Sequence, residues 1–303
     1  MSIPIVALAV LAHGVVGAGS PWKAGRTTES WADRSYIVKL PKAVEKPDAK
    51  LPLVMLLHGF SGSAEAIEAY SGFGGMNDTE GFILVAPQGL GRPAGWNCGF
   101  INLGKAGTDD VSFLSKLMDK VSADLPVDPS RIYVAGHSNG AMMANVLGGL
   151  RPDKIAAIAC VAGVIGVGKT NPKLMAEPKG PVSVLHIHGT NDQIVGYSTS
   201  AAALLSGVGA KDAVKWWASQ TGIESKGVEE KLKGYDSLTY SNGSTTVKLL
   251  SLTGWSHDWP VSQRSPINGA KTIWDFFKAN PKRPAVIDPK LPPIPATPVA
   301  APR

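Results

Sequence analysis

The chain has 303 residues, of which 44% are hydrophobic and 18% charged, with a formal net charge of +6 at pH 7. This composition is too apolar for a disordered chain, has too little charge for a coiled coil, and with two cysteines excludes a disulfide scaffold and a multi-cysteine zinc module. The basic residues are scattered and no apolar run reaches the roughly 18 residues of a membrane span, so we expect neither a nucleic-acid nor a membrane partner.

The two ends of the chain differ from the middle. An apolar run at 3–12 is followed by small residues up to Ala18, which predicts a signal peptide over residues 1–18 and a secreted, extracellular protein. The alternative is a cytosolic protein that begins with an apolar strand. Residues 280–303 hold eight of the 23 prolines, which predicts an extended tail. Between them lies the segment 19–279, whose length suits a single α/β domain.

The middle of the chain alternates between strand-like and helix-like segments. Short apolar, β-branched runs predict strands at 35–40, 52–58, 82–86, 131–135, 155–161, 182–188 and 246–252. Helical periodicity lies between them at 111–124, with Asp110 as its expected N-cap, and at about 139–150, 199–220 and 269–279. This alternation predicts an α/β fold with a mostly parallel central sheet and helices on both faces, whose function gathers at the carboxyl ends of the strands.

A nucleophile motif follows the strand at 131–135. The segment Gly136-His137-Ser138-Asn139-Gly140 matches G-x-S-x-G between a strand and a helix. A serine in so sharp a turn has a strained backbone, and side chains two positions away would collide, so glycine is needed there. The turn also puts Ser138 at a helix N-terminus, which favours developing negative charge. The alternative is an ordinary glycine-rich turn.

A loop with the character of an oxyanion hole follows the strand at 52–58. His58-Gly59-Phe60 stands between a buried strand and a helix. In an enzyme of this architecture, one backbone N–H of such a loop and the N–H of the residue after the nucleophile bind the oxyanion, here Phe60 and Asn139. His58 itself is expected to pack and hydrogen-bond rather than act as a base.

An acid and a base follow two later strands. Asp192 lies just past the strand at 182–188, and His257 lies in the loop after the strand at 246–252. The order Ser, Asp, His with spacings of 54 and 65 residues is the one expected of a strand-end triad. Asp258 is the rival acid, but it adjoins His257 and would point away from its ring. His186 and His188 share one strand face, where buried, hydrogen-bonded imidazoles are preferred over a metal site.

These residues give the chain a resemblance to the α/β-hydrolase superfamily. It is most similar to secreted polyhydroxybutyrate-depolymerase-like and feruloyl or acetylxylan-esterase-like proteins, through LLHGFSGSA, GFILVAPQG, GWNCGF, DDVSFL, VDPSRIYVAGHSNGAMMA, VLHIHGTNDQIVGY and GWSHDWP. The resemblance implies a serine carboxylic ester hydrolase with Ser138 as nucleophile, Asp192 as acid and His257 as base. Departures from the group's usual residues at Trp255, Ser256 and Gly196 are expected to alter the pocket.

The expected reaction is two-step acyl transfer on an ester substrate, including polymeric plant-polysaccharide or polyester substrates, and it requires no metal or cofactor. Trp96, Trp255 and Trp259 are candidates for stacking on the substrate, with structural anchoring as the alternative. Cys98 and Cys160 are either bridged or free. A peptidase, another acyl transferase with the same triad, and a silent polysaccharide-binding protein are the rival functions.

Overall fold

The computed structural model describes the chain from residue 20 to residue 282 with short gaps, over residues 20–167, 173–174, 177–199, 203–261 and 263–282. The expected signal peptide at 1–18 lies outside the described residues, and so do residues 283–303 of the expected tail.

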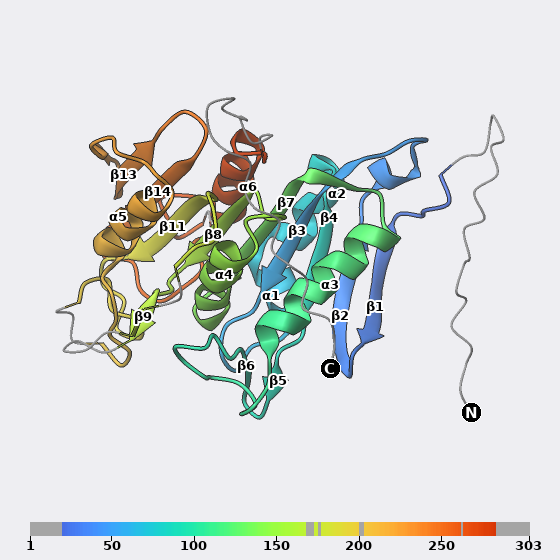
Figure 1. Cartoon of the computed structure of the whole chain (residues 1–303), viewed down its shortest axis with the longest axis horizontal. Helices are drawn as coiled ribbons and strands as arrows, with labels where there is room; N and C mark the ends of the chain where they lie inside the picture. The colour runs from blue at the N-terminus through green and yellow to red at the C-terminus, as the bar shows by residue number, and fades with distance from the viewer. Residues whose placement is uncertain (1–19, 168–172, 175–176, 200–202, 262, 283–303) are drawn as a thin grey trace, which may run out of the picture.

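A ten-stranded sheet forms the centre of the molecule (Figure 1). From one edge to the other its strands are β1 (Gly25–Trp31), β2 (Arg34–Leu40), β4 (Ile83–Pro87), β3 (Leu51–Leu57), β7 (Val127–His137), β8 (Ala157–Val161), β11 (Ser183–Gly189), β14 (Thr246–Leu252), β13 (Tyr235–Ser241) and β12 (Val228–Leu232). The strands from β4 to β14 are parallel, and antiparallel strands flank them on both sides. The predicted mostly parallel sheet is therefore confirmed.

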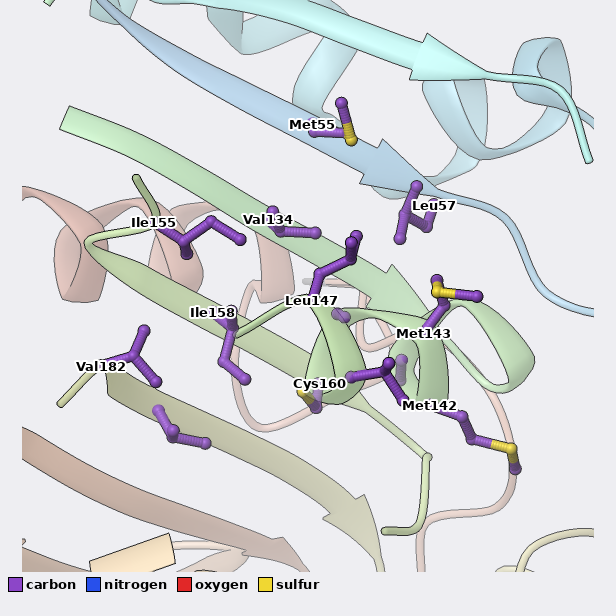
Figure 2. Packing of buried hydrophobic residues seen from close by; sticks show 14 of the residues in the cluster. Met55, Leu57, Val134, Met142, Met143, Leu147, Ile155, Ile158, Cys160 and Val182 are labelled. Atoms are coloured by element: carbon purple, nitrogen blue, oxygen red, sulfur yellow. The ribbon is translucent and has the colours of Figure 1, made fainter. Parts of the chain in front are cut away.

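Helices cover both faces of this sheet. Three of them share one hydrophobic cluster and cover one face: α3 (Asp110–Asp124), α4 (Asn139–Leu150) and α5 (Ala210–Gln220). The other face is covered by α1 (Ala64–Ser71), α2 (Phe73–Glu80) and α6 (Gly269–Ala279). Strand β3 illustrates the division, since Met55 and Leu57 face the first cluster (Figure 2) whereas Val54 and Leu56 face the second. Within the described residues, none of the helices has the length and apolarity needed to cross a membrane.

Each of the seven predicted strands has a counterpart in the sheet, because runs that are buried on both faces carry a strong apolar signal. The helix predicted at 199–220 is wrong over the described residues 203–209, since α5 begins only at Ala210. The backbone of Leu205 instead hydrogen-bonds to Ile194 and Gly196, so the chain just before α5 lies alongside the loop after β11. The predicted N-cap is also one residue off, because Asp109 caps α3 by accepting from the Ser112 N–H at 2.9 Å.

The two edge strands of the sheet, one helix and several short elements have no counterpart among the predictions. All but one residue of β1 and every residue of β12 are exposed, so neither carries the apolar pattern of a buried strand. Helix α2 contains two glycines and lies between two more, Gly72 and Gly81, whose positive φ values of 87° and 74° end one helix and the next. The remaining short elements are η1 (Lys42–Glu45), β5 (Leu90–Gly91), β6 (Ala94–Gly95), β9 (Gly166–Val167) and β10 (Lys173–Leu174).

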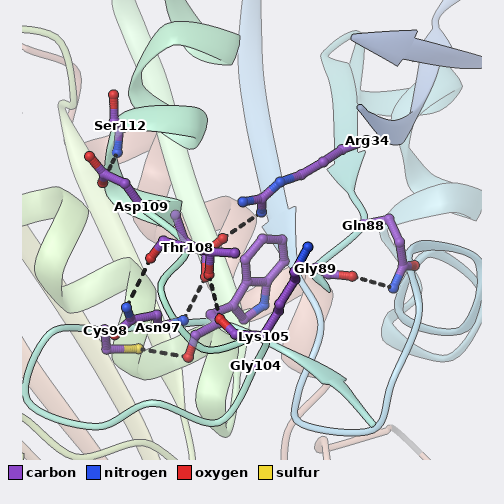
Figure 3. A network of polar contacts seen from close by, with 12 residues as sticks. Arg34, Gln88, Gly89, Asn97, Cys98, Gly104, Lys105, Thr108, Asp109 and Ser112 are labelled. Atoms are coloured by element: carbon purple, nitrogen blue, oxygen red, sulfur yellow. Dashed lines mark hydrogen bonds and ion pairs between the residues drawn. The ribbon is translucent and has the colours of Figure 1, made fainter. Parts of the chain in front are cut away.

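A buried ion pair fixes the long loop between β6 and α3. Asp110, free of the capping role, meets Arg34 of β2 at 2.5 Å, and both side chains are almost fully buried. The second carboxylate oxygen of Asp110 accepts the Asn97 N–H at 2.6 Å and the Thr108 hydroxyl at 3.2 Å (Figure 3). Because the charge is compensated by an ion and by hydrogen bonds, it can remain buried, and it ties residues 97–108 to the sheet.

Candidate active site

Ser138 stands at the sharp turn between β7 and α4. Its backbone has φ 55° and ψ −118°, a conformation that side-chain-bearing residues rarely adopt and that costs about 1–3 kcal/mol. Its N–H donates to the carbonyl of Val161 at the end of β8, at 2.8 Å, and its own carbonyl accepts from Met142 in the first turn of α4. The strain is thus held by a strand on one side and a helix on the other.

The flanking glycines are required by space, as the motif predicted. A Cβ at Gly140 would lie 2.2 Å from the Leu57 carbonyl oxygen, and one at Gly136 would lie 2.2 Å from the Gly140 carbonyl oxygen. Both distances are far below a van der Waals contact, and in both cases the nearest atom belongs to the backbone and cannot move out of the way. Gly59 is also close, since its Cβ would lie 3.3 Å from the Cβ of Ser138. The loop after β3 and the nucleophile turn are therefore in direct contact.

Three side chains from the ends of three strands form one hydrogen-bonded chain. The Ser138 hydroxyl lies 2.8 Å from Nε2 of His257, and Nδ1 of His257 lies 2.7 Å from Oδ2 of Asp192. They follow β7, β14 and β11 respectively, which lie in one parallel part of the sheet. With a proton on Nδ1, His257 donates to the carboxylate and can accept the serine proton on Nε2.

Asp192 is held as a carboxylate. Its Oδ1 accepts the backbone N–H groups of Ile194 and Val195 at 2.9 and 2.8 Å. Burial raises the pKa of Asp192, but hydrogen bonds from His188 and His257 outweigh burial and keep that pKa well below its usual range. The rival acid differs in every respect, because Asp258 is exposed and its carboxylate accepts from the Ser256 hydroxyl at 2.7 Å.

Two histidines of β11 support the acid from behind. His188 Nε2 lies 2.9 Å from the Val195 carbonyl oxygen and 3.3 Å from Oδ2 of Asp192, and His186 Nε2 lies 3.0 Å from His188 Nδ1. Burial, together with the neighbouring His188, lowers the pKa of His186 to about 3, so this imidazole is neutral. In the part of the chain that the structure describes, no group of three or more His, Cys, Asp or Glu side chains could hold a metal ion.

The side chain of His137 contacts the backbone of His257, the predicted base, and the motif alone does not indicate this contact. Its Nε2 lies 2.9 Å from the carbonyl oxygen of His257, to which the Nε2–H donates, and its Nδ1 lies 3.1 Å from the hydroxyl of Tyr70, which donates to it. Burial, with the repulsion of nearby His257, lowers the pKa of His137 to about 4. His137 therefore fixes the loop that carries His257 without adding a second positive charge.

The two segments expected to bind an oxyanion lie against Ser138. Asn139 begins α4 and is fully buried, and Phe60 follows Gly59 in the loop after β3. Among the residues that the structure describes, no protein group accepts a hydrogen bond from the Phe60 N–H or from the Asn139 N–H. His58 is buried, its Nδ1–H donates to the Gly59 carbonyl, and its Nε2 accepts the Gly89 N–H. This imidazole shapes the loop, as expected from the sequence.

Two of the three candidate tryptophans do not reach the surface. Trp96 is fully buried and Trp259 is 4% exposed, so neither offers a face to a substrate, and for these two the stacking prediction is wrong. Their indole N–H groups instead donate to the carbonyls of His58 and Ser71. The sequence does not indicate this burial, because the residues next to the two tryptophans are small or polar. Trp255 is partly exposed, with its indole N–H donating to the Asp258 carbonyl at 2.8 Å, and it stays a candidate.

The two cysteines are free and buried in the same hydrophobic cluster. Burial raises the pKa of both the Cys98 and the Cys160 thiol, so neither is a reactive thiolate. Of the two alternatives that the sequence left open, the structure has the free thiols.

Comparison with known proteins shows that this chain is similar to esterases and depolymerases. Residues 34–176 match the family model of the esterase PHB depolymerases. Feruloyl esterase B of Piromyces equi is 29% identical over 81% of this chain and 45% of its own length. Poly(3-hydroxyalkanoate) depolymerase C of Paucimonas lemoignei is 27% identical over 76% of this chain and 60% of its own length. The chain thus spans roughly half the length of these curated relatives.

A solved structure confirms the fold. Acetyl xylan esterase from Aspergillus awamori superimposes with a TM-score of 0.61, 14% identity and coverage of 84% of this chain and 100% of its own. This similarity confirms the α/β-hydrolase fold that the sequence predicted.

The contact at Gly140 generates a test of the turn. We expect Gly140→Ala to lower the free energy of unfolding by about 2 kcal/mol or more and to move Ser138, because the methyl group would overlap the Leu57 carbonyl. The matched control is Gly75→Ala in α2, where a Cβ would meet nothing within 4 Å and stability should stay equal or rise by up to about 1 kcal/mol. Urea unfolding measures both. Equal stability of the two variants would contradict the packing argument.

Proposed function

We propose that this chain is a serine carboxylic ester hydrolase in which Ser138, His257 and Asp192 form the catalytic triad, since residues 34–176 match the family model of the esterase PHB depolymerases. The observation that carries this proposal is the continuous hydrogen-bond chain, with 2.8 Å between the serine hydroxyl and His257 and 2.7 Å between His257 and Asp192. The strained backbone of the serine and the depressed pKa of the acid support the same roles.

In the proposed reaction, Ser138 Oγ attacks the ester carbonyl carbon while its proton moves to Nε2 of His257. Asp192 accepts the Nδ1–H and stabilises the imidazolium that forms. His257 then gives its proton to the leaving alcohol as the C–O bond breaks, which leaves an acyl-serine. Water repeats the sequence: its proton moves to His257 as its oxygen attacks the acyl carbon, and His257 then returns this proton to Ser138 Oγ as the acyl C–Oγ bond breaks and the acid is released. This chain supplies each proton transfer from its own side chains.

We assign the oxyanion hole to the backbone N–H groups of Phe60 and Asn139. Both belong to segments in contact with Ser138, and the start of α4 adds the positive end of the helix dipole. Donors of this kind act on the charge that develops on the carbonyl oxygen, and the loss of one typically costs about 10²–10³ in kcat.

The rim of the site favours an ester with an apolar acyl group. Three exposed large side chains belong to segments that carry or contact the triad residues: Phe60 is 42% exposed in the loop after β3, Tyr70 is 40% exposed and hydrogen-bonds to His137, and Ile194 is 44% exposed in the loop that carries Asp192. Trp255, which is partly exposed and lies two residues before His257 in the chain, adds an aromatic side chain. Exposed apolar side chains that gather at one place mark a binding surface, and from them we infer a hydroxycinnamoyl or hydroxyalkanoate ester as substrate, including polymer-linked esters. The names of the relatives, feruloyl esterase and poly(3-hydroxyalkanoate) depolymerase, agree with these two classes.

Replacement of the nucleophile tests the triad. We expect Ser138→Ala to lower turnover of p-nitrophenyl butyrate by about 10⁴-fold or more, because the acyl-enzyme cannot form. A fluorophosphonate probe should label the wild type at Ser138, as located by peptide mass, and should not label the variant. An active variant would sink the triad, and an unlabelled, inactive wild type would favour a silent binding protein. A peptide amide in the same assay tests the peptidase alternative.

A substrate panel tests the acyl preference. We expect methyl ferulate or hydroxybutyrate oligomers to give a higher kcat/KM than acetylated xylan. Ile194→Ala should raise KM for the preferred ester about threefold or more, because apolar contact area is lost. Val228→Ala is the control, since Val228 is also exposed, at 62%, but lies on the edge strand β12. Preference for acetyl esters, or equal effects of the two variants, would argue against the proposed rim.

We also propose that the enzyme is exported, on the strength of the apolar run and the small residues before Gly19. Expression of the whole chain in a secreting bacterial host should yield a protein in the medium whose N-terminus, read by Edman sequencing, is Gly19. Full-length protein retained in the cytosol would contradict this proposal.

A further inference from the structure

Trp96 lies between the two segments assigned to the oxyanion hole and is hydrogen-bonded to both. Its indole Nε1–H donates to the carbonyl oxygen of His58 at 2.8 Å, two residues before Phe60. Its backbone N–H donates to Oδ1 of Asn139 at 2.6 Å, and its carbonyl accepts from Nδ2 of Asn139 at 3.1 Å. One fully buried residue thus connects the loop after β3 to the first residue of α4.

The pairing with Asn139 is specific to an amide side chain. The amide oxygen of Asn139 accepts the Trp96 N–H, and its amide nitrogen donates to the Trp96 carbonyl. The side chain thus pairs with the backbone of one residue as a neighbouring strand would. A buried side chain bonded twice in this way has no rotational freedom left, so the start of α4 is fixed relative to residue 96. The backbone N–H of Asn139 is therefore fixed as well.

The segment around Trp96 is itself rigidly anchored. The Ala94 carbonyl accepts the Ser61 N–H at 2.7 Å, which adds a second bond to the loop after β3. Gly95 has no room for a side chain, because a Cβ there would lie 2.1 Å from the Leu103 carbonyl oxygen and 3.0 Å from Oδ1 of Asn139. On the other side, the Asn97 N–H donates to Asp110, whose charge is paired with Arg34 (Figure 3).

We propose that Trp96 is a positioning residue for the oxyanion hole: it holds the Phe60 and Asn139 N–H groups at the separation and direction that the developing oxyanion requires. This inference rests on the proposed ester hydrolase function. Because the donors are fixed before the substrate arrives, they stabilise charge without reorganising. A misplacement of about 1 Å can cost 10²-fold in rate, so loss of the connection should affect the transition state more than substrate binding.

The test compares two buried tryptophans that differ in what they hold. Trp96→Phe removes the indole N–H bonded to His58. Trp217→Phe is the matched control, since Trp217 is also fully buried and its Nε1–H donates to Oδ1 of Asn145 at 2.8 Å, away from the triad. We expect kcat for p-nitrophenyl butyrate to fall about 10- to 100-fold in Trp96→Phe, with KM within about twofold of the wild type. Trp217→Phe should keep kcat within about twofold.

A tetrahedral adduct provides a second readout that a general structural defect would not produce. Phenylboronic acid forms a bond from Ser138 Oγ to boron, and the oxygen on boron occupies the oxyanion hole. Its inhibition constant should rise in Trp96→Phe by about the same factor as kcat falls. Equal kcat in the two tryptophan variants would overturn the inference. A rise in KM with unchanged kcat would overturn it too, because that pattern indicates a substrate contact.

Asn139→Leu covers the case in which Trp96→Phe fails to fold. It removes both side-chain bonds to Trp96 but retains the backbone N–H at position 139, so we expect the same fall in kcat with little change in KM. Unchanged kcat in this variant would overturn the inference. Turnover that survives in Ser138→Ala would instead count against the proposed function, whereas full kcat in Trp96→Phe beside an inactive Ser138→Ala would count against the positioning role alone.

Discussion

The backbone of Ser138 can keep its strained conformation only if the structures on either side leave it no alternative. The Ser138 N–H donates to strand β8, and the Ser138 carbonyl accepts a hydrogen bond from helix α4. The Leu57 carbonyl of β3 lies where a side chain at position 140 would be. The three strands concerned, β3, β7 and β8, are neighbours in the sheet. The parallel sheet therefore does more than carry the proposed nucleophile, since the free energy of its close packing offsets about 1–3 kcal/mol of backbone strain.

The same close approach explains why the predicted oxyanion donors are near the nucleophile. Gly59 allows the loop after β3 to touch Ser138, and Asn139 follows Ser138 directly. Two donors from different segments must also keep their mutual geometry, and this part of the arrangement depends on residues remote in sequence. The contacts of Trp96 and the buried pair of Arg34 and Asp110 serve this second requirement, which no motif around the serine expresses.

The sequence predicts the parts of this site that obey local rules. Buried strands are apolar throughout, a strand-to-helix turn needs Gly136 and Gly140, and the three side chains of the triad follow strands that end at one edge. It could not predict the burial of Trp96 and Trp259, because both stand in loops whose neighbours are polar or small, and their burial comes from tertiary contacts. The sequence also could not predict where α5 begins, because the residues before α5 pair with the loop that carries Asp192. The N-cap predicted at Asp110 is off by one residue, because Asp109 is an equally good N-cap residue.

Solvation and partners divide the histidines into different roles, although the residue type is the same. His58, His137 and His186 have lowered pKa values because they are buried without a carboxylate in hydrogen-bond contact. They stay neutral and hold loops through carbonyl, N–H and imidazole partners. His257 differs in having the Asp192 carboxylate at Nδ1 and a hydroxyl at Nε2, with its side chain 19% exposed. In the proposed reaction His257 gains and loses a proton, which a charged partner favours, and the neutral histidines around it would keep the positive charge on this one ring.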